Sequence, residues 1–344
     1  MPLTDIRPYL EDARRKKYAL GCFNVFDTET LEGVIEAAVN KKTPIVCAIY
    51  EPQFKYGDLE SFTDLIKNVA AKTDIPVILH LDHATELSSI VRAIKCGFTA
   101  VMFDGPVGAS LEEKVEKTKR AVEIAHLAGA TVEAELGYIT RVGVDERASK
   151  ENIADPRLAK EFIDSTGIDI LAPAIGSIHG MGEQKATLNL ELLSQIAAST
   201  NCFLSLHGGS GVDDLIVQKA IDLGISKASV YTRLSNRAIE RVRERLSISN
   251  GDISEILNEV RNGFREVVEN RLEILRSVNV CDPADNSCHY CNSDRYCVSK
   301  TAIPAFPTTQ PYIKSSVIEN MSNRTYEDIL NNVSSLLADY IRNK

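Results

Sequence analysis

The stretch PVILHLDH, residues 76–83, decides the fold of this chain. It opens as a short apolar run typical of a buried strand, and side chains with acid–base and metal-binding chemistry follow at once. Further β-rich runs of similar length recur along the chain, and helical patterns separate them. The eight predicted strands span Leu20–Asn24, Pro44–Ile49, Pro76–Leu81, Thr99–Asp104, Thr131–Glu135, Ile168–Ile175, Cys202–His207 and Lys227–Thr232.

The segments between these strands carry apolar residues at helical spacing, most clearly at Thr28–Asn40 and Leu111–Leu127. Eight such units predict a closed parallel barrel, the (β/α)8 TIM-barrel fold of the α/β class, rather than an open sheet. A barrel needs roughly 250 residues, and the chain has 344. We therefore expect a barrel over residues 1–280, whose last helices run from Leu234 to Asn279, and a separate extension over residues 281–344.

The composition is that of a folded, acidic protein. Hydrophobic residues make up 44% of the chain and charged residues 25%, which supplies a sizeable core and excludes wholesale disorder. The net charge of -9 argues against a broad basic surface for nucleic acid or an anionic membrane. No apolar run approaches the roughly 20 residues of a membrane-spanning helix, and the N-terminal segment lacks the apolar core of a secretory signal. We expect a cytoplasmic protein.

Three of the six histidines come just after predicted strands. His83, His179 and His207 follow the third, sixth and seventh strands, so a barrel brings them to one mouth. Three imidazoles that leave a fourth position open are typical of a catalytic zinc site. His126 lacks this context and is expected to be an ordinary helix residue, and His80 is expected to pack or hydrogen-bond inside the barrel.

A glycine-rich turn opens a helix after the seventh strand, and it reads Gly208-Gly209-Ser210-Gly211. Glycine lets the backbone approach an anion closely, and a helix N-terminus presents oriented N–H donors. Barrels commonly bind phosphate near the seventh and eighth strands. The turn therefore predicts a local phosphate site on an otherwise acidic protein.

Carboxylates stand at the ends of three strands. Asp82 precedes His83, and a carboxylate in that position can carry the proton of a substrate hydroxyl while a metal polarises the adjacent carbonyl. Asp104 and Glu135 are candidates for a direct metal or substrate role, with the alternative that they orient metal ligands from behind. Two further candidates lie in the loop after the fifth strand: Asp145 and Glu146.

Together these residues resemble the class II, zinc-dependent fructose-bisphosphate and tagatose-bisphosphate aldolase family. The resemblance runs from about Leu10 to Asn279, nearly the whole predicted barrel, and its motifs are highly specific as a set. They are GCFNV at 21–25, HLDHA at 80–84, VMFDG at 101–105, VEAELG at 132–137, AIGSIHG at 174–180 and HGGSG at 207–211.

The resemblance implies one catalytic zinc on the three histidines, with Asp82 handling the proton of the hydroxyl at the bond that breaks or forms. It implies an alternative, inward metal position at Asp104 and Glu135. The implied reaction is reversible cleavage of a ketose bisphosphate to dihydroxyacetone phosphate and an aldehyde. We expect a homodimer or homotetramer. The predicted substrate-binding residues, with a monovalent cation beside the phosphate, are Asn24, Gly180, Gly208, Gly209, Ser210, Ser229 and Thr232.

Three regions depart from the family pattern. One is Met181-Gly182-Glu183, which follows His179-Gly180 where an aromatic or basic run is common. After the eighth strand, Ser229 replaces an asparagine that contacts the donor, and the bulky Tyr231 stands beside the expected phosphate. In the loop after the fifth strand the acid that deprotonates the donor is shifted, so we assign its role to Glu146, with Asp145 as the alternative. These departures leave open a specialised aldolase that joins another enolate donor, such as a 2-keto acid, to a phosphate- or phosphonate-bearing aldehyde. A non-catalytic metal-binding scaffold is the remaining alternative.

The extension carries half of the eight cysteines. Cys281, Cys288, Cys291 and Cys297 form a Cys-rich segment over 281–297, and the spacing of the middle pair favours a second, structural metal site. Two disulfides or a simple cysteine-rich loop are the alternatives. A proline-containing linker follows, and residues 325–344 have the apolar spacing of an amphipathic helix.

Overall fold

The structure is a computed structural model of the whole chain. It describes residues 3–55, 57–106, 108–140, 153–180, 186–248 and 251–281. Eight parallel strands form one closed barrel in which each strand pairs with its neighbours in chain order, and β1 pairs with β8 to close the ring. The predicted TIM barrel is confirmed. The strands are β1 Leu20–Asn24, β2 Ile45–Tyr50, β3 Val77–Ala84, β4 Ala100–Phe103, β5 Thr131–Leu136, β6 Ile170–Pro173, β7 Phe203–Leu206 and β8 Ile225–Val230.

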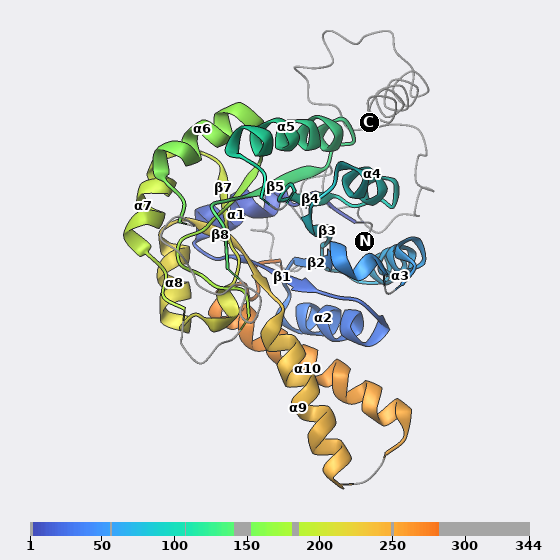
Figure 1. Cartoon of the computed structure of the whole chain (residues 1–344). Coiled ribbons are helices and arrows are strands. Elements are labelled where there is room, and N and C mark those ends of the chain that lie inside the picture. The colour runs from blue at the N-terminus through green and yellow to red at the C-terminus, as the bar shows by residue number, and fades with distance from the viewer. Residues whose placement is uncertain are drawn as a thin grey trace.

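Helices alternate with the strands and surround the barrel (Figure 1). The predicted helix over Leu111–Leu127 is found with the same bounds, whereas β8 starts two residues earlier than predicted and ends before Thr232, which begins a helix. The helices are α1 Arg7–Lys16, α2 Thr28–Lys41, α3 Leu59–Ala71, α4 Leu87–Lys95, α5 Leu111–Leu127, α6 Pro156–Thr166, α7 Leu190–Ser199, α8 Asp214–Asp222, α9 Thr232–Ile248 and α10 Ile253–Ile274, with short 3-10 turns η1 Glu51–Lys55 and η3 Gly209–Gly211.

Local sequence explains where several helices begin and end. Asp27 caps α2 by accepting a hydrogen bond from the Thr30 backbone N–H, while the Thr30 hydroxyl accepts one from the Asp27 N–H. Asp155 caps α6, whose first residue is a proline that has no N–H to satisfy. The same helix ends at Gly167 in the left-handed conformation that favours glycine. These residues fix the start of α2 and both ends of α6.

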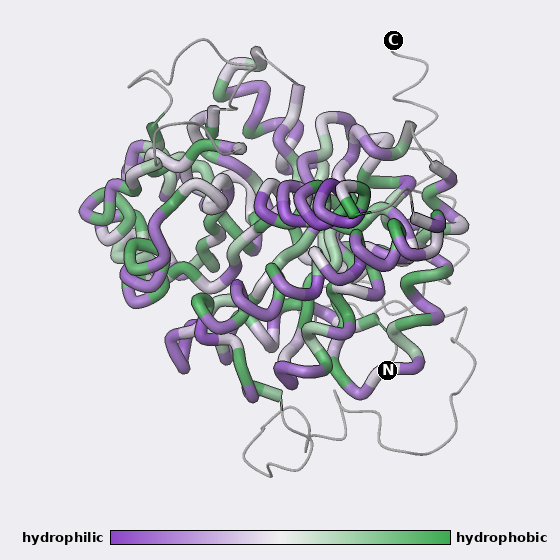
Figure 2. The backbone as a smooth tube through the Cα atoms, turned by 90° about the horizontal axis from the view of Figure 1, so that it is seen from below, coloured by the Kyte–Doolittle hydropathy of each residue, from purple (hydrophilic) through white to green (hydrophobic). Residues whose placement is uncertain are grey.

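The core has two parts, one on each side of the strands. The larger lies between the barrel and the outer helices. The smaller lies inside the barrel and includes Tyr9 and Leu10 of α1 and the preceding Ile6. The Arg14 guanidinium binds two backbone carbonyls, of Asn201 and Cys202, and so holds α1 across the barrel. Figure 2 shows hydrophilic and hydrophobic stretches alternating along the outer helices, as expected for helices with one buried face. The part of the barrel interior next to α1 is apolar, whereas His80, Glu133 and Lys227 are buried charged or polar residues of the strands.

Helices α9 and α10 form a hairpin that extends beyond the barrel (Figure 1). Gly263 lets α10 approach α9 closely, since a Cβ there would lie 2.8 Å from the Ala238 Cα. Arg241 pairs with Glu259 and Glu266 across the hairpin. The hairpin therefore holds its own shape without packing fully on the barrel.

Several predictions fall outside the described residues: Asp145, Glu146, Cys288, Cys291, Cys297, the proline-containing linker and the helix over 325–344. Cys281 is described, and its side chain is buried. None of the helices in the described part of the chain is long and apolar enough to cross a membrane.

Candidate active site

A bulge in β3 aims two consecutive side chains at the barrel mouth. Leu81 pairs with Val101 and Ala84 with Phe103, so β3 has one more residue than β4 over the same span. The extra residue is absorbed at His83, whose φ is 56°, in a left-handed conformation that is uncommon for a non-glycine residue. In a regular strand neighbouring side chains point to opposite faces. The bulge lets both Asp82 and His83 reach the site.

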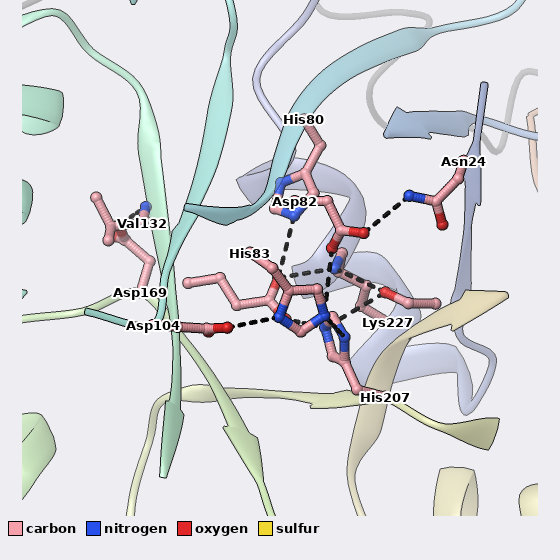
Figure 3. A network of polar contacts seen from close by, with 11 residues as sticks. Asn24, His80, Asp82, His83, Asp104, Val132, Asp169, His207 and Lys227 are labelled. Atoms are coloured by element: carbon pink, nitrogen blue, oxygen red, sulfur yellow. Dashed lines mark hydrogen bonds and ion pairs between the residues drawn. The ribbon is translucent and has the colours of Figure 1, made fainter. Parts of the chain in front are cut away.

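The three predicted histidines do converge. His83, His179 and His207 each offer a ring nitrogen within 4.8 Å of the others. The His83 Nε2 and His207 Nδ1 atoms face each other at 3.2 Å (Figure 3). The His179 ring centroid lies 5.0 Å from that of His83, and a hydrogen bond from its backbone N–H to the Thr140 carbonyl anchors the loop that carries it. Strands β3, β6 and β7 thus supply one ligand each.

Carboxylates behind two of these rings determine where their protons lie. The Asp104 Oδ2 is 2.7 Å from the His83 Nδ1, and the Glu133 Oε1 is 2.8 Å from the His207 Nε2. A carboxylate accepts hydrogen bonds, so those two nitrogens carry protons, and the two facing nitrogens are the ones left for a metal. Although burial lowers it, the Asp104 and Asp82 carboxylates raise the pKa of His83 to about 10, so without a metal its Nε2 is protonated and can donate to the His207 Nδ1 at 3.2 Å. A metal that binds there replaces this proton. The donor set fits zinc, which prefers neutral imidazole ligands.

A second set of ligand atoms shares His83 with the first. His83, Asp104 and Glu135 also bring one ligand atom each within 4.8 Å. Burial and the nearby Asp104 carboxylate raise the pKa of Glu135 to about 7. The Ile139 backbone N–H donates to the Glu135 Oε1 at 3.0 Å. This arrangement could hold the same metal in an inward position.

Asp82 has the surroundings of a base rather than a ligand. Its Oδ2 accepts a hydrogen bond of 2.8 Å from the Asn24 Nδ2, while its Oδ1 is buried with no hydrogen-bond partner among the described residues. Burial raises the pKa of a carboxyl, but the neighbouring His83 and His207 outweigh it and hold the pKa of Asp82 below its usual range. The carboxylate is therefore ionised and one oxygen is ready for a substrate proton.

The glycine turn closes the site after β7. Gly208 has a φ of 65°, and a Cβ there would lie 2.7 Å from the Ile178 carbonyl carbon. The turn passes beside Gly180, whose carbonyl oxygen is 3.5 Å from the position of a Cβ on Gly211, and Ser210 is buried within it. At position 208 only glycine permits this approach, which brings the turn against the segment that carries His179.

The end of β8 departs from the family pattern in a specific way. The Ser229 hydroxyl lies 3.2 Å from the Lys227 Nζ and 3.4 Å from the His207 Nε2. Tyr231 is 42% exposed and meets the Phe26 ring edge-on, with centroids 6.5 Å apart. Ser229 therefore faces the histidines, whereas the aromatic pair lines the rim.

Comparison with known proteins agrees with this geometry. The family described as fructose-bisphosphate aldolase class-II matches residues 4–280. The chain belongs to this family. It is therefore an aldolase of the zinc-dependent class and a lyase, which argues against the scaffold alternative.

Similar sequences and structures cover the barrel almost completely. A probable fructose-bisphosphate aldolase of Bacillus subtilis is 34% identical over 284 residues, which are 81% of this chain and 99% of the relative. The crystal structure of the YdjI aldolase from Escherichia coli K12 is 33% identical, with a TM-score of 0.74, and covers 81% of this chain and all of that one. A putative fructose-1,6-biphosphate aldolase from Coccidioides immitis is 27% identical, with a TM-score of 0.72, over 79% of this chain and 96% of that chain.

Two residues of this family member were not singled out from the sequence. Glu133 and Lys227 are completely buried inside the barrel, and their charged atoms lie 2.7 Å apart. The alternation of side chains along a strand could have identified them, because Glu133 shares a face with Glu135 and Lys227 shares one with Ser229. Charged residues on the inner face of a barrel strand require a partner or a function.

The two remaining histidines behave differently from the site histidines. His126 on α5 pairs with Asp169 at 2.7 Å, away from the mouth. His80 is buried inside the barrel, as expected, and neither of its ring nitrogens forms a hydrogen bond with the described residues. Its Nε2 lies 3.7 Å from the Glu133 Oε2.

Proposed function

We propose that this protein is a zinc-dependent aldolase that reversibly cleaves a ketose bisphosphate, such as fructose or tagatose bisphosphate, to dihydroxyacetone phosphate and an aldehyde. The observation that carries the proposal is the convergence of His83, His179 and His207, whose ligand nitrogens lie within 4.8 Å of one another, next to the ionised Asp82. The names of the relatives, which are fructose-bisphosphate aldolases, support the substrate class.

In this proposal His83, His179 and His207 hold one zinc ion. When bound, zinc supplies a Lewis acid that polarises the donor carbonyl and stabilises negative charge as the carbon–carbon bond breaks. Asp82 takes the proton of the substrate hydroxyl beside that bond through its free Oδ1, and Asn24 keeps the carboxylate in place through the Oδ2. Cleavage then needs no Schiff-base lysine.

The phosphate of the donor would bind at the glycine turn. Backbone N–H groups of Gly208, Gly209 and Ser210 supply the donors, with Gly180 beside them and a monovalent cation as a further proposal. Ser229 and Thr232 border the same end of β8.

The roles of the remaining acids extend the proposal. Asp104 and Glu135 would hold the metal in the inward position. We assign deprotonation of the donor to Glu146, with Asp145 as the alternative.

The test is release of dihydroxyacetone phosphate from fructose and tagatose bisphosphate by the zinc-loaded protein. Turnover at ordinary enzyme rates supports the proposal, and it should vanish when a chelator removes the metal. Turnover only with another donor, such as a 2-keto acid with a phosphate- or phosphonate-bearing aldehyde, would instead support the specialised alternative, which Ser229 and Tyr231 favour. The same panel of donors and aldehydes therefore separates the two reactions.

We also propose that the protein is a homodimer or homotetramer in the cytoplasm. The far end of the α9–α10 hairpin exposes apolar side chains, including Ile248 at 80% and Ile253 at 67%. Such a patch favours contact with another copy. Sedimentation of the wild type and of Ile248→Glu should show an oligomer that the variant weakens, and a monomeric wild type would refute it.

A second, structural metal site in the Cys-rich segment is the last part of the proposal. It comprises Cys281, Cys288, Cys291 and Cys297. Two zinc ions per chain in the full-length protein, and one after truncation at residue 280, would support it. One ion in both proteins would refute it.

A further inference from the structure

We infer that Glu133 and Lys227 act together as positioning residues: their buried ion pair fixes the orientation and the free ring nitrogen of His207 for metal binding. The inference rests on the zinc site of the proposed function. It assigns a task to the two charged side chains that the aldol reaction itself leaves unused.

The two oxygens of Glu133 are divided between two partners. Oε1 accepts the hydrogen bond from the His207 Nε2 at 2.8 Å, and Oε2 accepts one from the Lys227 Nζ at 2.7 Å. The Glu133 and Lys227 side chains are fully buried, and that of His207 is 2% exposed. A rotation of the carboxylate would break one contact and leave a buried charge unpaired, which is costly. Lys227 therefore fixes the orientation of the Glu133 carboxylate, and that carboxylate in turn fixes the orientation of His207.

Ser229 closes this arrangement into a ring. Its hydroxyl lies 3.2 Å from the Lys227 Nζ and 3.4 Å from the His207 Nε2. Because the contact of His207 to Glu133 is the shorter, the Nε2 proton belongs to that hydrogen bond. Strands β5 and β8 thus brace a ligand that follows β7, and Figure 3 shows Lys227 and His207 on this network.

The network of Glu133, Lys227 and Ser229 determines which ring nitrogen of His207 is free to bind the metal. With the proton held on Nε2, the Nδ1 keeps its lone pair and faces the His83 Nε2. Partners behind a metal-bound histidine typically contribute 10–100-fold to metal affinity. Without this network of side chains, the His207 imidazole could rotate or exchange its proton between nitrogens, and zinc would bind less tightly.

The experiment measures zinc affinity of the metal-free protein by competition with a chelating dye. Glu133→Leu combined with Lys227→Met removes both charges and keeps the volume apolar, which generally preserves folding. We expect its zinc Kd to rise by about 10–100-fold. Glu133→Gln keeps an acceptor oxygen and should lose less. Nitrogen-15 spectra of His207 in the metal-free proteins should show one tautomer in the wild type and a mixture in the double variant.

Asp169→Asn is the matched control, because Asp169 pairs with His126 at 2.7 Å outside the site. Its zinc Kd should equal that of the wild type. A folded double variant with a zinc Kd within about twofold of the wild type and a single His207 tautomer would overturn the inference while leaving the proposed function intact. A wild type that binds no zinc would instead refute the proposed zinc site itself.

Discussion

Replacement of Gly208 by alanine gives the sharpest test of the glycine turn. The residue has a φ of 65°, and a left-handed conformation costs a non-glycine residue about 1–2 kcal/mol. A Cβ would also lie 2.7–2.9 Å from the N, C and O atoms of Ile178, which are backbone atoms and cannot rotate away. Overpacking of this kind typically costs about 1–3 kcal/mol. Gly208→Ala should therefore lower the free energy of unfolding by about 2–5 kcal/mol.

Gly108→Ala is a matched control for the conformational part of that cost. Gly108 has a φ of 79°, but apart from its chain neighbours none of the described residues lies within 4 Å of its Cβ position. This variant should lose only about 1–2 kcal/mol. Urea denaturation of the two metal-free variants measures the difference, and the KM for the bisphosphate substrate reports on the turn. Equal stability of the two variants together with an unchanged KM for Gly208→Ala would refute the reasoning.

Three further predictions concern the carboxylates and the metal. Asp82→Asn should keep its zinc and lose kcat by about 10²–10⁴-fold, since it removes a general base; unchanged turnover in a steady-state assay would take Asp82 out of the chemistry. His83→Ala should lose its zinc, measured as metal per chain, and zinc should restore activity to chelator-treated wild type but not to the variant; full metal content in the variant would contradict the ligand assignment. The pKa of Glu135 is raised to about 7 from an ordinary 4.5, so its stabilising effect is complete below that ordinary value and disappears as the pH rises through 7. Between pH 4.5 and 8 the free energy of unfolding of the metal-free wild type should therefore fall by up to about 3 kcal/mol relative to that of Glu135→Gln. Thermal denaturation at several pH values measures this, and an equal change of Tm with pH in the two proteins would exclude it.

The sequence predicts those parts of the structure that depend on local pattern. Apolar runs that end in polar residues located all eight strands to within a few residues, and the position of His83, His179 and His207 after three of them was enough to place them at one mouth. The glycine turn was likewise predictable because its residue types and its place in the barrel agree. Boundaries were less accurate where a strand continues beyond its apolar run, as β3 does to Ala84.

What the sequence does not predict depends on contacts between distant strands. The bulge at His83 is visible only as a mismatch in register between β3 and β4. Glu133 lies 74 residues from its partner His207 and 94 from Lys227, so no local spacing joins them. Ser229 was interpreted through a substrate contact, whereas its hydroxyl already has neighbours inside the barrel. Only the closed ring of strands brings these groups together.

In the proposed function one short segment, His207 to Ser210, holds both the metal and the phosphate, so the two binding sites are linked in an acidic protein. The charge of Lys227 is taken up by Glu133, so the buried lysine offers no cation to a phosphate. In this proposal attraction comes from the metal and from the oriented N–H groups of the turn. His207 and Gly208 are consecutive residues, so a displacement of the histidine also moves the start of the turn. Loss of the metal should therefore weaken phosphate binding as well as the chemical step, because it removes a positive charge and releases the histidine that precedes the turn.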